Sequence, residues 1–146
     1  MQNVVGSDTA VRQLALLTEI KTLLTGGTLH LFKESFSPNV NSTLADFIAA
    51  EADYTGYAAV VLTWGANALD ADGGYVSQSS RAFFQCTTDT ADNVIGGAWL
   101  QIEGTPDVLW EYFTFPIAVN LSTALTYLAA VIGLREPNPD TGIFES

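Results

Sequence analysis

Stretches in which apolar and polar side chains alternate make up much of this 146-residue sequence, and turn residues separate them. Alternation with a period of two is typical of strands that bury one face. The stretches that suggest strands are 28–32, 57–64, 81–88, 94–103 and 108–115. They do not alternate with helices, which argues against a parallel α/β sheet. The sequence therefore predicts a mainly all-β fold, either an antiparallel β-sandwich of jelly-roll type or a partly open barrel.

The stretches 94–103 and 108–115 flank the turn residues 104–107 and should form a hairpin. Strict alternation along the second arm puts Val108, Trp110 and Tyr112 on one face and Leu109, Phe113 and Phe115 on the other. Because both faces are apolar, this strand is predicted to lie centrally in a sheet or beneath a partner, and Pro116 is predicted to end it. Residues 121–134 suit a helix or a strand, and their β-branched residues favour the strand.

An amphipathic helix is predicted before the first strand, over residues 8–25, with the glycine pair 26–27 ending it. Its apolar face includes Leu14, Leu17, Ile20 and Leu24. A helix of this length needs a partner surface, so we expect this face to bind a neighbouring subunit. Packing on its own domain is the alternative. A further helical turn is predicted over residues 43–48, with Ser42 as its cap.

The composition changes at residues 135–146, where two prolines favour an extended arm. Ile143 and Phe144 give this arm an apolar anchor, and we expect a neighbouring subunit to order it. An untethered chain end is the alternative. The predicted organisation is thus an N-terminal segment with the helix (1–27), a β-sandwich domain (28–134) and an extended C-terminal arm (135–146).

The charge balance narrows the choice of partners. Five basic residues stand against 16 acidic ones, which gives a net charge of −11. Such a surface repels phosphate backbones and anionic lipid, so neither nucleic acid nor a membrane is expected as a partner. A basic protein surface is a better match. No apolar run is long enough for a transmembrane helix, the first residues lack a secretory pattern, and the single cysteine, Cys86, is predicted to be buried.

Few side chains in this sequence suit catalysis. His30 is the one histidine, and as a general base it would need a nucleophile and an orienting carboxylate from elsewhere in the fold. Glu51 and Asp53 flank one residue and could form an acid–base pair. We interpret His30 as structural and the two carboxylates as solvated, and we expect no enzyme. An acidic hydrolase that uses these residues is the weaker alternative.

No metal or cofactor site is predicted. Asp70 and Asp72 resemble the start of a calcium loop, but Arg81 stands where the closing glutamate should be. Asp89 and Asp92 could join them around a cation, but we interpret the aspartates as turn and loop residues. An aromatic platform for sugar rings is the alternative to core packing for Trp64, Trp99, Trp110, Tyr75 and Tyr112.

Several segments between residues 29 and 134 have a distinctive order and spacing. They read Leu29-His30-Leu31-Phe32-Lys33, Phe36-Ser37-Pro38, Ser42-Thr43-Leu44-Ala45-Asp46-Phe47, Ala52-Asp53-Tyr54-Thr55-Gly56-Tyr57-Ala58 and Val108-Leu109-Trp110-Glu111-Tyr112-Phe113 with Pro116. In this respect the chain resembles a group of small uncharacterised proteins encoded among the structural genes of tailed bacteriophages. The resemblance implies a virion component with no catalytic residues to carry over.

Together, the residues and the resemblance lead us to expect a non-enzymatic protein of the virion. The preferred role is a capsid decoration or cement subunit that binds and stabilises the major capsid lattice. We expect it to form homo-oligomers and to contact phage capsid or tail proteins. A tail- or fibre-associated virion protein and a carbohydrate-binding module for host-surface recognition are the alternatives.

Overall fold

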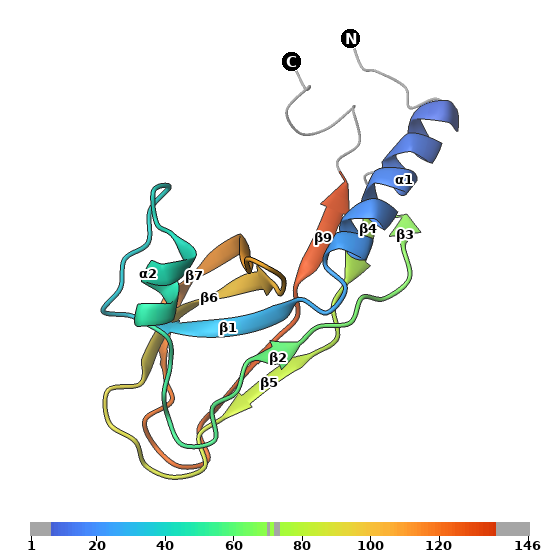
Figure 1. Cartoon of the computed structure of the whole chain (residues 1–146). Coiled ribbons are helices and arrows are strands. Elements are labelled where there is room, and N and C mark those ends of the chain that lie inside the picture. Colours follow the sequence, from blue (N-terminus) through green and yellow to red (C-terminus); the bar gives the residue numbers. More distant parts are fainter. Residues whose placement is uncertain (1–6, 70, 72–73, 137–146) are drawn as a thin grey trace. The chain divides into compact units, whose positions relative to one another are not determined.

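The computed structural model describes residues 7–69, 71 and 74–136, and it is mainly β, with antiparallel sheets and an N-terminal helix (Figure 1). The predicted fold class is confirmed at that level. The elements are α1 (Ser7–Leu23), β1 (Thr28–Lys33), α2 (Leu44–Ala49), β2 (Val60–Val61), β3 (Ala68–Leu69), β4 (Tyr75–Gln78), β5 (Ala82–Gln85), β6 (Val94–Ile102), β7 (Val108–Asn120), β8 (Tyr127–Ala130) and β9 (Gly133–Glu136). None of the helices in the described ranges has both the length and the apolar character needed to cross a membrane.

The chain forms two compact units. Unit 1 contains α1, residues 63–80 and the described residues from 131 onward, and unit 2 consists of Gly26–Leu62 and Arg81–Ala130. The structure therefore divides the predicted domain 28–134, because β3, β4 and β9 form a sheet of their own on which α1 packs. The predicted arm, 135–146, begins inside β9. Its anchor residues Ile143 and Phe144 lie outside the described residues.

Unit 1 is a three-stranded antiparallel sheet of order β3-β4-β9, and α1 contacts β4 and β9. Leu17 and Leu24 are completely buried, whereas Leu14 and Ile20 are partly exposed. The expectation that this face binds a neighbouring subunit is therefore corrected for Leu17 and Leu24. Both side chains are covered within the chain, because α1 finds its partner surface in its own unit.

The end of α1 is fixed by its sequence. Gly26 has φ +78°, a left-handed conformation that glycine adopts without a steric penalty, so the helix ends where the glycine pair predicts. Lys21 Nζ donates hydrogen bonds to the carbonyl of Gly65 (2.6 Å) and to Asn67 Oδ1 (2.8 Å). The Asn67 amide in turn donates to Thr18 Oγ1 (3.1 Å). These bonds hold the last turns of α1 against the segment that precedes β3.

The main sheet of unit 2 has the order β2-β1-β6-β7, and every neighbouring pair is antiparallel. β6 and β7 form the predicted hairpin. On one face, Phe32, Phe47 and Trp99 make a buried cluster. The Phe47 ring, from α2, lies 5.4 Å from that of Phe32 and 5.5 Å from that of Trp99, centroid to centroid. α2 therefore covers this face of the sheet.

Thr43, and not the predicted Ser42, caps α2. Thr43 Oγ1 accepts a hydrogen bond from the backbone N of Asp46 (3.4 Å), and Asp46 Oδ2 accepts one from the backbone N of Thr43 (2.8 Å). Ser42 Oγ instead accepts from the backbone N of Asn39 (2.9 Å). Thr43 is preferred because it stands three residues before a carboxylate, which completes a capping box.

β7 lies at the edge of the sheet and not at its centre, and it continues through Pro116 to Asn120. Val119 pairs with Ile95, but the next pair towards the hairpin is Thr114 with Gly97. Residues 115–118 therefore bulge away from β6. Pro116 is tolerated there because its missing N–H is not required by a regular ladder.

A second irregularity in β7 changes which side chains face the core. The register shifts between Leu100 and Gln101, so that Trp110 has no opposite residue on β6. Leu109 and Tyr112 consequently both pack against the Phe32, Phe47 and Trp99 cluster. The predicted assignment of these two residues to opposite faces is wrong, because a bulge adds one residue to the period of two.

β5 and β8 form a separate two-stranded antiparallel ribbon in unit 2. The strand predictions for 81–88, 57–64 and 121–134 are confirmed only in part, since β5, β2, β8 and β9 are much shorter. Leu125 has φ +69°, which marks the turn that delays the start of β8. Cys86, directly after β5, is buried and free, as predicted.

Candidate functional site

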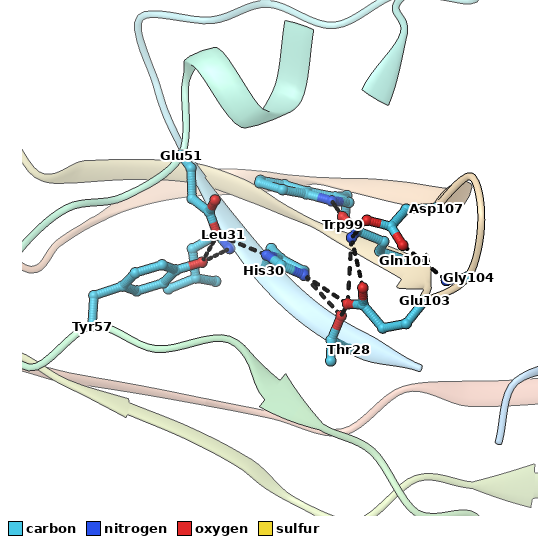
Figure 2. Close-up of polar contacts among 10 residues, drawn as sticks. All are labelled: Thr28, His30, Leu31, Glu51, Tyr57, Trp99, Gln101, Glu103, Gly104 and Asp107. Atoms are coloured by element: carbon cyan, nitrogen blue, oxygen red, sulfur yellow. Dashed lines mark hydrogen bonds and ion pairs between the residues drawn. The ribbon is translucent and has the colours of Figure 1, made fainter. Parts of the chain in front are cut away.

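His30 lies at the centre of a network of hydrogen bonds in unit 2 (Figure 2). Thr28 and His30 are two residues apart on β1, so their side chains lie on the same face of the sheet. Glu51 follows α2 and forms a β-bridge with the β1 residue Phe32, which sets its carboxylate beside the imidazole. The structure thus brings together two of the predicted candidates, His30 and Glu51.

The two ring nitrogens of His30 have different partners. Nδ1 lies 2.7 Å from Glu51 Oε2, and Nε2 lies 2.8 Å from Thr28 Oγ1. The Thr28 hydroxyl donates to Glu103 Oε1 at 2.6 Å, and this oxygen is also 4.0 Å from Nε2. The side chain of His30 is only 13% exposed. The network therefore joins β1, the segment after α2 and the residue after β6, and it runs from the shielded imidazole to the Glu103 side chain, which is 47% exposed.

Trp99 covers the imidazole from the neighbouring strand β6. The Trp99 and His30 rings stack with their centroids 4.6 Å apart and their planes 13° apart. Trp99 is completely buried, and its Nε1 donates to Gln101 Oε1 at 3.1 Å. The buried indole N–H is thus satisfied by a residue on the same face of the same strand.

Gln101 connects the network to the turn of the β6–β7 hairpin. Its amide donates to both carboxylate oxygens of Glu103, at 3.3 Å, and to Asp107 Oδ2, at 3.4 Å. Asp107 Oδ1 accepts from the backbone N of Gly104 at 2.8 Å. The hairpin turn is therefore held by the same set of bonds that reaches His30.

Tyr57 closes the network on the side of Glu51. Its hydroxyl donates to Glu51 Oε2 (2.6 Å) and accepts from the backbone N of Leu31 (3.1 Å). Burial raises the pKa of Glu51, but hydrogen bonds with His30 and Tyr57 and attraction to His30 outweigh burial, and the pKa lies below its ordinary value. Burial, with the hydrogen bond to Glu51, raises the pKa of Tyr57 far above its ordinary value. At neutral pH Glu51 is thus ionised and Tyr57 keeps its proton.

Thr28, His30 and Glu51 stand in the order of hydroxyl, imidazole and carboxylate that is familiar from acyl-transfer enzymes. In such enzymes the hydroxyl gives its proton to the imidazole. Here the Thr28 hydroxyl donates to Glu103 instead. The arrangement in the structure therefore links neighbouring segments and does not prepare Thr28 as a nucleophile.

The other acidic candidates that the structure describes take no part in the hydrogen bonds of this network. Asp53 Oδ1 pairs with Lys33 Nζ at 2.9 Å, and its side chain is exposed. Asp89 accepts a backbone hydrogen bond, and Asp70 and Asp72 lie outside the described residues. Within the ranges that the structure describes, no three side chains of His, Cys, Asp or Glu are grouped so as to hold a metal ion.

Two members of the aromatic platform that was the alternative to core packing are core residues, as the preferred interpretation predicted. Trp99 is completely buried, and Tyr112 packs against the same cluster. Trp64 and Tyr75 belong to unit 1, whereas Trp110 belongs to unit 2. Trp110 is the most exposed of the three tryptophans, at 37%.

The outer edge of β7 presents apolar side chains to solvent. Val108, Trp110 and Ile117 are exposed, and Ile117 reaches 82%. Among the described strands, β7 pairs with β6 alone, so the backbone groups along its other edge have no strand partner. Such an edge can accept another chain.

The β5–β8 ribbon carries a second exposed surface, which the sequence analysis did not identify. Phe83 and Tyr127 stack on one face of the ribbon, with ring centroids 5.5 Å apart, and both are exposed. The guanidinium of Arg81 lies 5.5 Å from the centroid of the Phe83 ring, and Leu125 is exposed just before β8. The signal in the sequence is that Phe83 alternates with the buried residues Ala82 and Phe84.

No protein-family model, curated protein or solved structure matches this chain. The His30 network, the edge of β7 and the β5–β8 ribbon are thus the features from which its function is inferred. The His30 network consists of polar contacts within unit 2, whereas the edge of β7 and the β5–β8 ribbon present apolar side chains to solvent.

Proposed function

We propose that this chain is a non-enzymatic structural subunit of a bacteriophage virion, namely a decoration or cement subunit that binds and stabilises the major capsid lattice. The observation that carries the proposal is the outer edge of β7, where exposed Trp110 and Ile117 accompany backbone groups without a strand partner. Open strand edges and exposed apolar residues are typical of surfaces at which proteins associate. The resemblance to proteins encoded among phage structural genes supports the same role.

The charge of the chain supports a partner of opposite sign. A net charge of −11 favours approach to a basic or mixed surface, and the apolar residues of β7 would then supply contacts that persist after docking. Identical copies of so acidic a chain repel one another. Contacts between copies in a homo-oligomer therefore depend on apolar surfaces, for which the β5–β8 ribbon is the proposed site.

The sandwich expected from the sequence is part of the proposal for unit 2. Its first layer is the β2-β1-β6-β7 sheet, and the β5–β8 ribbon belongs to the second. Leu29 and Leu31 support this arrangement, because they are completely buried and alternate along β1 with His30, whose face carries the Trp99 stack. A buried face on each side of β1 requires a covering layer on each side.

A tail- or fibre-associated role uses the same surfaces with a different partner. A carbohydrate-binding role is favoured by one observation only, the exposed indole of Trp110, since indole faces stack on sugar rings. That role predicts a glycan-array signal that is lost in Trp110→Ala and kept in Ile117→Ser. Loss of capsid binding in both variants supports the cement role instead.

The test compares particle incorporation of the full chain with that of a β7 variant, Trp110→Ala/Ile117→Ser. Ile117 is 82% exposed and Trp110 37%, so circular dichroism first checks that the variant folds, and its incorporation into heads of the encoding phage should then fall at least about tenfold if these contacts supply a few kcal/mol. Cryo-microscopy of the particles, with quantitative mass spectrometry, gives the copy number and distinguishes the head from the tail.

Val40→Ser is the matched control, because Val40 is 94% exposed in the connection before α2 and is distant in sequence from β7. It should incorporate like the unaltered chain. Absence of the chain from purified particles would overturn the proposal. Equal incorporation of the β7 variant and the control would overturn the assignment of β7 as the docking edge.

A further inference from the structure

The hydrogen bonds around His30 determine how many protons its ring carries. Each short contact between two electronegative atoms needs one hydrogen between them, and each hydroxyl has only one to give. The contacts in Figure 2 can therefore be assigned one by one, beginning with the groups whose protonation is already fixed.

The Nδ1 side is fixed by Glu51 and Tyr57. The Tyr57 hydroxyl accepts a hydrogen bond from the backbone N of Leu31 and donates its only hydrogen to Glu51 Oε2. Glu51 is a carboxylate at neutral pH and can only accept. The 2.7 Å contact between Glu51 Oε2 and His30 Nδ1 therefore requires a hydrogen on Nδ1.

The Nε2 side is fixed by Thr28. The Thr28 hydroxyl donates its only hydrogen to Glu103 Oε1, 2.6 Å away, so its oxygen can only accept from His30. The 2.8 Å contact between Thr28 Oγ1 and His30 Nε2 then requires a hydrogen on Nε2 as well. With a hydrogen on both nitrogens the ring is an imidazolium cation.

The surroundings of the ring suit a cation. The titratable groups that face it are Glu51 from the segment after α2, Tyr57 from the segment before β2, Glu103 at the end of β6 and, through Gln101, Asp107 of the hairpin turn. Three of these four are carboxyl groups. Trp99 stacks nearly parallel on one face of the ring at 4.6 Å, and the negative face of an indole attracts a cation.

We propose that His30 is an imidazolium in the folded protein and that it acts as a pH-sensitive latch, a side-chain tie between β1 and the turn of the β6–β7 hairpin that adds to the backbone pairing of β1 with β6. When the pH rises, Nε2 releases its proton to water and becomes an acceptor. The Thr28 hydroxyl then turns its hydrogen towards Nε2, and no hydrogen remains between Thr28 Oγ1 and Glu103 Oε1. Two oxygens that share no hydrogen repel one another at 2.6 Å, so Glu103 moves away from Thr28, and the turn of the hairpin loses its side-chain tie to β1 while the backbone pairing of β1 with β6 remains.

The test follows the single imidazole in the ¹⁵N-labelled full chain by long-range ¹H–¹⁵N NMR, from pH about 5 to about 9, the range in which histidine changes charge. At pH about 6 we expect both ring nitrogens to have imidazolium shifts. As the pH rises, the amide of Gly104 and the indole N–H of Trp99 should shift along the same curve as the ring. A ring nitrogen without a proton at the lower pH, or a Gly104 amide that does not follow the ring, would overturn the latch.

Two variants at Thr28 complete the test. Thr28→Val keeps nearly the same shape but lacks the hydroxyl, so the Gly104 shift should no longer follow the titration of His30. Thr28→Ser restores the hydroxyl and should restore the common curve. Persistent coupling in Thr28→Val would show that Thr28 does not transmit the change. Should Thr28→Val fail to fold, the unaltered chain and Thr28→Ser still decide the question, and no capsid partner is needed for either.

Discussion

Gly97, on β6, has no room for a side chain. A Cβ atom at this position would lie 2.1 Å from the carbonyl oxygen of Phe113 and 2.4 Å from Cζ of Phe32. The first neighbour is backbone of the paired strand, and the second belongs to the buried cluster, so neither can move without cost. Glycine at this position lets β6 and β7 pair directly over the Phe32 ring.

Gly97→Ala should therefore lower the free energy of unfolding by about 3 kcal/mol, the upper range for overpacking a core. Urea denaturation followed by circular dichroism measures the change. Gly133→Ala is the matched control, since a Cβ there meets nothing within 4 Å, and it should change stability by less than about 0.5 kcal/mol. Equal stability of the two variants would contradict the packing described for β6.

Glu51 should make the free energy of unfolding decrease at acidic pH. Burial raises its pKa, but hydrogen bonds with His30 and Tyr57 and the attraction of His30 lower it further, to below the ordinary value of 4.5. The ionised form is thus favoured by folding, and its contribution is present above pH 4.5 and lost as the pH falls through the lower folded pKa.

Glu51→Gln should accordingly flatten the decline of the unfolding free energy below pH 4.5. The measurement is a set of urea denaturation curves across the acid range, and the slope against pH is compared, not the absolute stability. Glu111→Gln, at an exposed position of β7, is the control and should keep the slope of the unaltered chain. A slope unchanged in Glu51→Gln would show that Glu51 does not contribute through its charge.

Single residues also show how far the site could be predicted. His30 and Glu51 are identifiable as candidates by residue type, and Cys86 by its apolar neighbours. The sequence does not show that His30 and Glu51 meet, because 21 positions separate them and only the β-bridge of Glu51 with Phe32 brings them together. Gln101 and Glu103 follow Trp99 at every second position, along β6 and directly after it. This alternation of polar residues is the signal in the sequence that could have predicted the rest of the network.

At the scale of elements, α2 depends on its cap. It has only six residues, too few to be stable in isolation, and the Thr43–Asp46 capping box satisfies backbone groups at its start. Its importance is that Phe47 covers the face of the sheet that carries Phe32 and Trp99.

Thr43→Ala should lower the free energy of unfolding by about 1 kcal/mol, the usual value of a lost N-cap. Chemical denaturation measures the loss. Thr43→Ser keeps a hydroxyl at the same position and should retain most of the stability. If Thr43→Ser were as unstable as Thr43→Ala, the hydroxyl would not be the stabilising group.

The elements differ in how well the sequence predicts them. α1, β1 and β6 follow regular apolar spacing, and their existence and approximate extent are confirmed. β7 departs from prediction because strict alternation holds only in a regular ladder, and two bulges break it. Its position at the sheet edge depends on which strands pair, which is a property of contacts between distant residues.

At the scale of the whole molecule, the sequence predicts the fold class but not the division into units. Within residues 63–80 the strand pattern of the sequence covers only the end of the stretch 57–64, so no local signal assigns β3 and β4 to another unit than their neighbours in sequence. Their membership of unit 1 follows from the pairing of β4 with β9 and from the contact of both with α1. The charge of −11 is likewise a property of the whole chain, and it limits the choice of partner without identifying the docking residues.

The order in which the pieces of unit 1 occur along the chain affects how the protein is made. α1 leaves the ribosome before the segments of unit 2, and β9, on which it packs, leaves after them. While the segments of unit 2 are being synthesised, the leucines that α1 buries in the finished molecule have only part of their covering. Unit 1 can therefore be completed only after β9 has been synthesised, and shielding of the nascent helix by a ribosome-associated chaperone would protect the chain until then.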